Sequence, residues 1–178
     1  MLSKGESTRQ AICGRARELF CRQGFKGVTM QDICKATGLS RGGLYRHFES
    51  TGQIFTAILE SFGGNQNREI HEQIQRGVPP AIILEGLLCR YETEMLDSGS
   101  SLSLAICEFS SGPDCSGAPP VSRWYEASRA GWTELMRHGL DTGEFSCVDF
   151  QGVFDLIVFA YQGARLYGRL MDLPKDTA

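Results

Sequence analysis

Residues 29–48 read TMQDICKATGLSRGGLYRHF, and this stretch decides the fold of the first third of the chain. Thr29 is a good N-cap because its hydroxyl can accept a hydrogen bond from an unpaired backbone N–H of a first helical turn. Apolar residues follow at helical spacing: Met30, Ile33 and Cys34. Gly38 tolerates the left-handed conformation that ends a helix. The stretch therefore predicts a short helix that begins after Thr29 and ends at Gly38.

A second short helix is predicted directly after this one. Leu39 fills the angle between the two helices, and Ser40 can cap the second. Leu44, Phe48 and the ring of Tyr45 can pack the second helix against the rest of the domain. Two short helices joined by a turn of three or four residues that contains glycine form a helix-turn-helix, whose second helix fits the major groove of DNA.

The predicted second helix offers basic and hydroxyl side chains and carries little acid. Arginine can reach guanine edges or phosphates, and Ser, Thr and Tyr hydroxyls can donate to phosphates. Two glycines inside one helix cost about 1 kcal/mol each relative to alanine, a cost explained by a phosphate backbone that must come close. The alternative interpretation is an ordinary surface helix with a loose N-terminus. The predicted DNA-binding residues are Thr29, Ser40, Arg41, Gly42, Gly43, Tyr45, Arg46, His47 and Thr51.

Residues 8–62 resemble the DNA-binding domain of the TetR/AcrR (tetracycline-repressor) family of bacterial transcription regulators. The matching words, in order, are ARELF at 16–20, GF at 24–25, VTM at 28–30, DI at 32–33, Ala36, GLS at 38–40, GLY at 43–45, HF at 47–48 and IF at 54–55. The resemblance implies an all-α chain with two domains. Residues 1–62 would form a three-helix, homeodomain-like helix-turn-helix domain, and residues 63–178 a larger helical domain for ligand binding and dimerisation.

The same resemblance implies a function. A homodimeric repressor would read two palindromic half-sites of a double-stranded DNA operator in successive major grooves. A small-molecule effector, not identifiable from the sequence, would release it. Members of the family usually carry a Lys near the start of the fourth helix, where this chain has Glu49 and Thr51. Thr51 and the backbone N–H groups of that helix could still bind a phosphate.

Charge is distributed unevenly along the chain, whose net formal charge is −3. Residues 1–62 hold nine Lys or Arg and five Asp or Glu, which gives +4. Residues 63–178 hold nine and sixteen, which gives −7. A basic head on an acidic body suits a protein that touches phosphates with one end only.

Seven cysteines are scattered without C-x-x-C spacing, so the sequence does not predict a metal site. Their odd number and the lack of a signal-peptide pattern lead us to expect a cytoplasmic protein. The longest apolar run, Val153–Tyr161, contains Asp155 and is too short for a membrane span. No membrane partner and no cofactor besides the effector is expected.

The C-terminal two-thirds are predicted to be helical throughout. Residues 53–76 are predicted to form one helix or a kinked pair, with glycines 63 and 64 as the expected break and domain boundary. Residues 81–96 are expected to turn Ile82, Leu84, Leu87, Leu88, Tyr91 and Met95 inward. The candidate lining of an effector pocket is Tyr91, Met95, Phe109, Trp124, Trp132 and Met136, with ordinary core packing as the alternative for each.

The last predicted helix, from about residue 149 to 171, is apolar nearly all round, so it should bury two sides. We expect one side to face its own domain and the other a second copy of the chain, while a monomer's central core helix is the alternative. The candidate dimer interface is Phe154, Ile157, Val158, Tyr161, Ala164 and Arg165.

Two other functions were considered. A redox-sensing regulator would use Cys107 or Cys115 as its reactive thiol, although Cys115 stands beside Asp114, which does not favour the thiolate. An enzyme is not expected, because the sequence carries no nucleophile elbow, metal-binding cluster or paired acid–base motif. The sequence favours a DNA-binding regulator.

Overall fold

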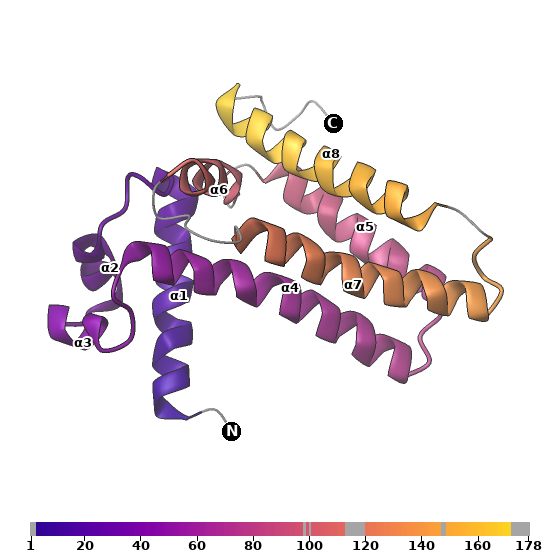
Figure 1. Ribbon diagram of the computed structural model, residues 1–178, viewed down its shortest axis with the longest axis horizontal. Helices are drawn as coiled ribbons and strands as arrows, with labels where there is room; N and C mark the ends of the chain where they lie inside the picture. Colours follow the sequence, from indigo (N-terminus) through magenta and orange to yellow (C-terminus); the bar gives the residue numbers. More distant parts are fainter. Residues whose placement is uncertain (1–2, 98, 100, 113–119, 147–148, 172–178) are drawn as a thin grey trace. The chain divides into compact units, whose positions relative to one another are not determined.

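A computed structural model describes residues 3–97, 99, 101–112, 120–146 and 149–171 of the chain. These residues form α-helices and no β-strand, which confirms the predicted all-α fold (Figure 1). The helices are α1 (Lys4–Gln23), α2 (Met30–Thr37), α3 (Arg41–Tyr45), α4 (Thr51–Gln75), α5 (Pro80–Leu96), α6 (Ser103–Ser110), α7 (Pro120–Asp141) and α8 (Phe150–Leu170). Among the residues described, no helix combines the length and apolar character that crossing a membrane requires.

The chain divides into two compact units. The first comprises residues 1–61 and 102–121, and the second residues 62–101 and 122–178. Helix α6 therefore belongs with the N-terminal helices, although it lies far from them in sequence. The predicted division into contiguous domains at residues 62 and 63 stays a prediction.

Aromatic rings hold the first unit together. The ring of Phe25, in the α1–α2 connection, lies 5.3 Å from that of Phe55 on α4 and 4.8 Å from that of Phe109 on α6. Phe20 of α1 meets Phe55 edge-on at 5.0 Å. All four rings are buried. Edge-on and tilted pairs at such distances stabilise a core beyond the area they bury, so this cluster joins α1, α4 and α6.

Two helices of the N-terminal half differ in part from what the sequence predicts. The apolar spacing predicts a first helix over residues 7–23, but α1 begins at Lys4, because Ser3 and Glu6 form a capping box at its start. Helix α4 continues through glycines 63 and 64 as one helix, so the expected break there is wrong. The two glycines cost about 1 kcal/mol each. Buried apolar side chains on both sides, Ile58 before and Ile70 after, fix the helix on either side of them.

The second unit has its core where α4, α5 and α7 meet. Buried Ile70, Ile83, Leu87 and Leu135 form one cluster there. The predicted inward face of α5 is partly wrong, since Ile82 is 54% and Leu88 41% exposed. Helix α5 carries apolar residues at helical spacing on more than one face, so this spacing alone did not show which face is buried.

Close approaches at glycines shape the second unit. A Cβ added to Gly131 of α7 would lie 2.2 Å from Asn67 Oδ1 on α4, so a larger residue would force the Asn67 side chain to move. Asn67 in turn donates a hydrogen bond to the Ala127 carbonyl at 2.7 Å. After α7, Phe145 packs against Gly139 and donates its backbone N–H to the Gly139 carbonyl at 2.9 Å. Gly143, with φ +75°, turns the chain between them.

Candidate nucleic-acid interface

The start of α2 is fixed by a capping box. Thr29 Oγ1 accepts the backbone N–H of Asp32 at 3.3 Å, and the Asp32 carboxylate accepts the backbone N–H of Thr29 at 3.0 Å. The Thr29 hydroxyl also donates to Asp32 Oδ2 at 2.6 Å. These hydrogen bonds from Thr29 lower the pKa of Asp32. Gly38, with φ +71°, ends the helix as predicted.

Helix α3 is five residues long and is held by its cap and two apolar anchors. Ser40 Oγ accepts the backbone N–H of Gly43 at 3.1 Å, which confirms Ser40 as the cap. Leu44 and Phe48 are buried. One face of α3 is therefore fixed to the unit, and the opposite face meets solvent.

The structure brings most of the predicted DNA-binding residues onto that exposed face. Ser40, Arg41, Gly42, Tyr45 and Arg46 are exposed, whereas Gly43 and His47 are partly buried. The Arg41 guanidinium lies over the Tyr45 ring, 5.5 Å from its centroid. A Cβ at Gly42 would meet no atom within 4 Å, so this position is open from outside. The arrangement offers a small surface with cationic and hydroxyl groups on a short helix, as groove and phosphate contacts require.

The other two predicted residues lie at helix starts. Thr29 is exposed at the start of α2, and Thr51 is partly buried as the first residue of α4. Ser50 Oγ accepts the Gln53 backbone N–H at 3.2 Å, so Ser50 caps α4. Glu49 accepts from the Gln53 side-chain amide at 3.1 Å. A carboxylate held at this helix start opposes a phosphate that approaches it.

Sequence reasoning missed the role of Arg9. Its guanidinium lies 3.9 Å from the centroid of the Phe48 ring and donates a hydrogen bond to the His47 carbonyl. Its place in the sequence favours a solvated face of α1. It instead ties α1 to the chain after α3, and the separation of 38 residues between Arg9 and His47 explains why no local pattern indicated it.

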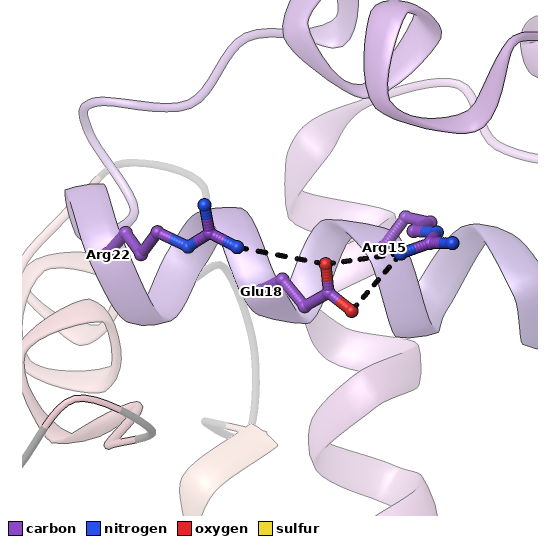
Figure 2. A network of polar contacts seen from close by, with 3 residues as sticks. All are labelled: Arg15, Glu18 and Arg22. Atoms are coloured by element: carbon purple, nitrogen blue, oxygen red, sulfur yellow. Dashed lines mark hydrogen bonds and ion pairs between the residues drawn. The ribbon is translucent and has the colours of Figure 1, made fainter.

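Not every arginine in the first unit is available to phosphates. Figure 2 shows Glu18 between two arginines of the same helix, Arg15 and Arg22. The nitrogen–oxygen distances are 3.4 Å to Arg15 and 3.9 Å to Arg22. All three side chains are more than half exposed, so these pairs contribute little to stability. The single carboxylate of Glu18 offsets one of the two positive charges.

Five of the six predicted effector-pocket residues lie in the second unit, where the buried ones belong to its core. Trp132 and Met136 of α7 are buried beside Phe154 of α8, with Tyr91 of α5 packed against them. Trp124 and Met95 are partly buried. Phe109 does not join this set, because it packs against Phe25 and Phe55 in the first unit. Its assignment to the pocket is therefore corrected.

For two of the six predicted dimer residues the structure corrects the assignment. Phe154 is 1% and Arg165 8% exposed, so neither presents surface to a partner. Ile157 and Val158 pack against the Trp132 cluster, and the Tyr161 ring packs against Tyr91, 5.2 Å between centroids. Of the six, Ala164 is exposed. The exposed apolar residues at this end of the chain are Leu156, Phe159, Tyr167, Leu170 and Met171, each at least 60% exposed.

The cysteine hypothesis is tested in part. Cys107 is exposed on α6, while Cys115 lies outside the described residues.

No group of His, Cys, Asp or Glu side chains in the described part of the chain could hold a metal ion.

Known proteins resemble this chain most clearly in its N-terminal part. The family described as "Bacterial regulatory proteins, tetR family" matches residues 12–58. The HTH-type transcriptional regulator AcrR of Shigella flexneri is 30% identical over 112 residues, which cover 60% of this chain and 52% of AcrR. The uncharacterized HTH-type transcriptional regulator YfiR of Bacillus subtilis (strain 168) is 44% identical over 54 residues, 30% of this chain and 26% of YfiR. The chain thus spans about half or less of the length of these curated relatives.

A solved structure extends the likeness to the whole fold. The crystal structure of regulatory protein TetR from Rhodobacter sphaeroides superposes with a TM-score of 0.72 at 19% sequence identity. The match covers 91% of this chain and 88% of that one. At this identity the likeness concerns the fold, an N-terminal helix-turn-helix followed by further helices.

Proposed function

We propose that this chain, which carries through residues 12–58 the DNA-binding domain of the tetR family of bacterial regulatory proteins, is a transcriptional regulator that binds double-stranded DNA as a homodimer. Helix α3 would enter the major groove. The observation that carries the proposal is the anchoring of α3 by Leu44 and Phe48 with Arg41 and Arg46 on its open face. A short, fixed helix with cationic side chains is the arrangement that groove readers use.

A stripe of apolar side chains on α8 supports the homodimer. Leu156, Phe159, Gly163, Tyr167 and Leu170 follow at spacings of three and four residues, so they share one face of the helix. The four large side chains are at least 60% exposed. A Cβ at Gly163 would meet no atom within 4 Å, which leaves room for a second helix to approach closely. A contiguous apolar stripe of this kind is typical of an interface between copies.

Regulation by a small molecule is the third part of the proposal. An effector that binds one of two dimer shapes more tightly would shift the dimer toward that shape. If the disfavoured shape is the one that spaces two copies of α3 to match neighbouring grooves, the effector releases DNA. The apolar core of the second unit around Trp132 is the candidate location.

The experiment that tests DNA binding is selection from a random double-stranded DNA library with the purified chain. The enriched sequence is then titrated at about 50 and 200 mM salt. We expect a palindromic site whose affinity falls steeply with salt, since neutralised phosphates release counterions. A library that yields no enriched sequence, at either salt concentration, contradicts the proposal.

A further inference from the structure

Three buried side-chain donors in the described part of the second unit have no hydrogen-bond partner, Arg165 Nε and two that are uncharged. Trp132 Nε1 on α7 and Gln66 Nε2 on α4 are buried and have no hydrogen-bond partner among the described residues. Trp132 as a whole is 1% exposed. Buried donors are normally paired, because a donor that leaves water without gaining an acceptor is costly. Two such donors in one core therefore require an explanation.

Both donors are directed at the same place, beside the phenol of Tyr91 on α5. Burial raises the pKa of Tyr91, and the N–H groups of Trp132 and Gln66 near its oxygen offset part of that rise. The phenol therefore stays protonated and is itself a donor. Neither N–H makes a hydrogen bond of good geometry with the Tyr91 oxygen. The two N–H groups thus lie beside the phenol oxygen of Tyr91, which accepts neither with good geometry.

The charges around this region are already matched. Arg165 of α8, 8% exposed, donates to Glu94 Oε2 at 3.1 Å, and Tyr161 donates to the same oxygen. Arg90, the other cation near Tyr91, is paired with Glu69 at 2.7 Å. Arg165 Nε has no acceptor of its own, but Glu94 already matches the charge of the guanidinium. A further carboxylate would therefore bury an excess negative charge, which is expensive.

The surroundings are apolar. Around Trp132 and Phe154 pack Leu84, Tyr125, Phe145, Ile157 and Val158. Glu94, which accepts a hydrogen bond from Tyr161, is 41% exposed at its side chain. A molecule that fits has an apolar body and an uncharged acceptor.

We propose that the second unit binds an uncharged, largely apolar molecule through a carbonyl oxygen, which accepts hydrogen bonds from Trp132 Nε1 and Gln66 Nε2 beside Tyr91. This inference rests on the proposed function and deepens it, because it names the chemical class of the effector. Core packing with two unpaired donors, or with a water between them, is the alternative that the test must exclude.

The probes are three monosubstituted benzenes. Acetophenone carries a carbonyl, benzoate a carboxylate, and ethylbenzene no hydrogen-bond acceptor. The full-length chain is labelled with ¹⁵N, and its two tryptophans give two indole N–H signals. Trp132→Phe removes one signal and so assigns it. We expect acetophenone to move the Trp132 indole proton downfield at one molecule per chain, and ethylbenzene and benzoate to leave it in place.

Calorimetry of two variants identifies the donors. Trp132→Phe and Gln66→Leu should each weaken acetophenone binding about three- to tenfold, the loss of one neutral hydrogen bond. Gln75→Leu, an exposed glutamine on the same helix as Gln66, should leave the affinity unchanged. Benzoate binding as tightly as acetophenone overturns the uncharged class. Failure of acetophenone to move the Trp132 signal overturns the site, whether or not the variants fold.

The same preparation of wild-type chain is titrated with its selected DNA. Sequence-specific DNA binding without acetophenone binding refutes this inference and leaves the proposed regulator standing. Acetophenone binding without any DNA binding refutes the regulator and leaves the carbonyl site. The two failures are therefore distinguishable.

Discussion

The carboxylate of Glu108 on α6 accepts a hydrogen bond from the backbone N–H of Lys26, with 3.0 Å between the two atoms. The residues are 82 positions apart, so this contact joins α6 to the connection between α1 and α2 within the first unit. Gly24 makes it possible. Its φ of +74° is unfavourable for other residues, and a Cβ there would lie 2.5 Å from Glu108 Oε2.

Replacing Gly24 should therefore be costly in two ways. Gly24→Ala adds backbone strain of about 1–2 kcal/mol and a clash with Glu108 of about 1–3 kcal/mol. Chemical unfolding of Gly24→Ala, Glu108→Ala and the double variant separates the two contributions. We expect Gly24→Ala to lower the free energy of unfolding less when Glu108 is already alanine. An equal loss in both backgrounds would show that the side-chain contact does not matter.

Local sequence predicted the helix-turn-helix because its boundaries depend on neighbours in sequence. The caps Thr29, Ser40 and Ser50 bond to backbone groups three residues away, and Gly38 ends α2 through its own φ. Contacts between distant residues were not predictable in this way. Arg9 on Phe48 is one, and the continuation of α4 through its two glycines is another, because it depends on packing on both sides.

The last helix shows a second limit. Helix α8 is apolar on most faces, so its pattern predicted two buried sides without saying which side faces the core. The structure turns Phe154 and Arg165 inward and leaves Leu156 and Phe159 outside. Only the positions of α5 and α7 decide that choice, and they are not encoded in α8 itself.

Acidic residues introduced into the exposed apolar stripe of α8 should prevent self-association. We expect Leu156→Asp combined with Phe159→Glu to convert a dimer to a monomer, because both side chains are at least 65% exposed in one chain and would become buried charges in an interface. Light scattering after size exclusion measures the mass. The control Ile82→Asp changes an exposed apolar residue of α5, 54% exposed, and should keep the dimer. A wild-type monomer, or a dimeric double variant, contradicts the proposed interface.

Acid should weaken the capping box of α2. Because hydrogen bonds from Thr29 hold the pKa of Asp32 below its usual value, the folded state favours the carboxylate. The resulting stability is present above the unfolded pKa of about 3.9 and is lost as pH falls through the lower folded pKa. Asp32→Asn lacks this dependence, so the difference in unfolding free energy between wild type and variant should shrink below about pH 4. A difference that stays constant between about pH 6 and about pH 2, on either side of the unfolded pKa, would contradict the assignment.

The arginines of the first unit should differ in their effect on DNA binding. Arg41→Ala and Arg46→Ala should each weaken binding to the selected site by about 1–3 kcal/mol if they read bases, or lower the salt slope by about one if they contact phosphate. Arg15→Ala is the matched control, since Arg15 is exposed on α1 and paired with Glu18. Equal losses for all three arginines would indicate a general charge effect and not a recognition surface on α3.

Substitution of Gly42 should separate an effect on stability from an effect on DNA binding. A Cβ added to Gly42 would have no atom within 4 Å, and the φ of Gly42 is not positive. Gly42→Ala should therefore leave the free energy of unfolding unchanged or raise it by about 0.5 kcal/mol. The same methyl group would stand where a phosphate backbone must come close to α3, so affinity for the selected DNA should fall. Thermal unfolding and a DNA titration on one preparation measure both effects. Because α3 is only five residues long, unchanged DNA affinity in a folded Gly42→Ala variant would mean that the DNA backbone approaches this unit elsewhere, and that the two glycines of α3 serve no binding role.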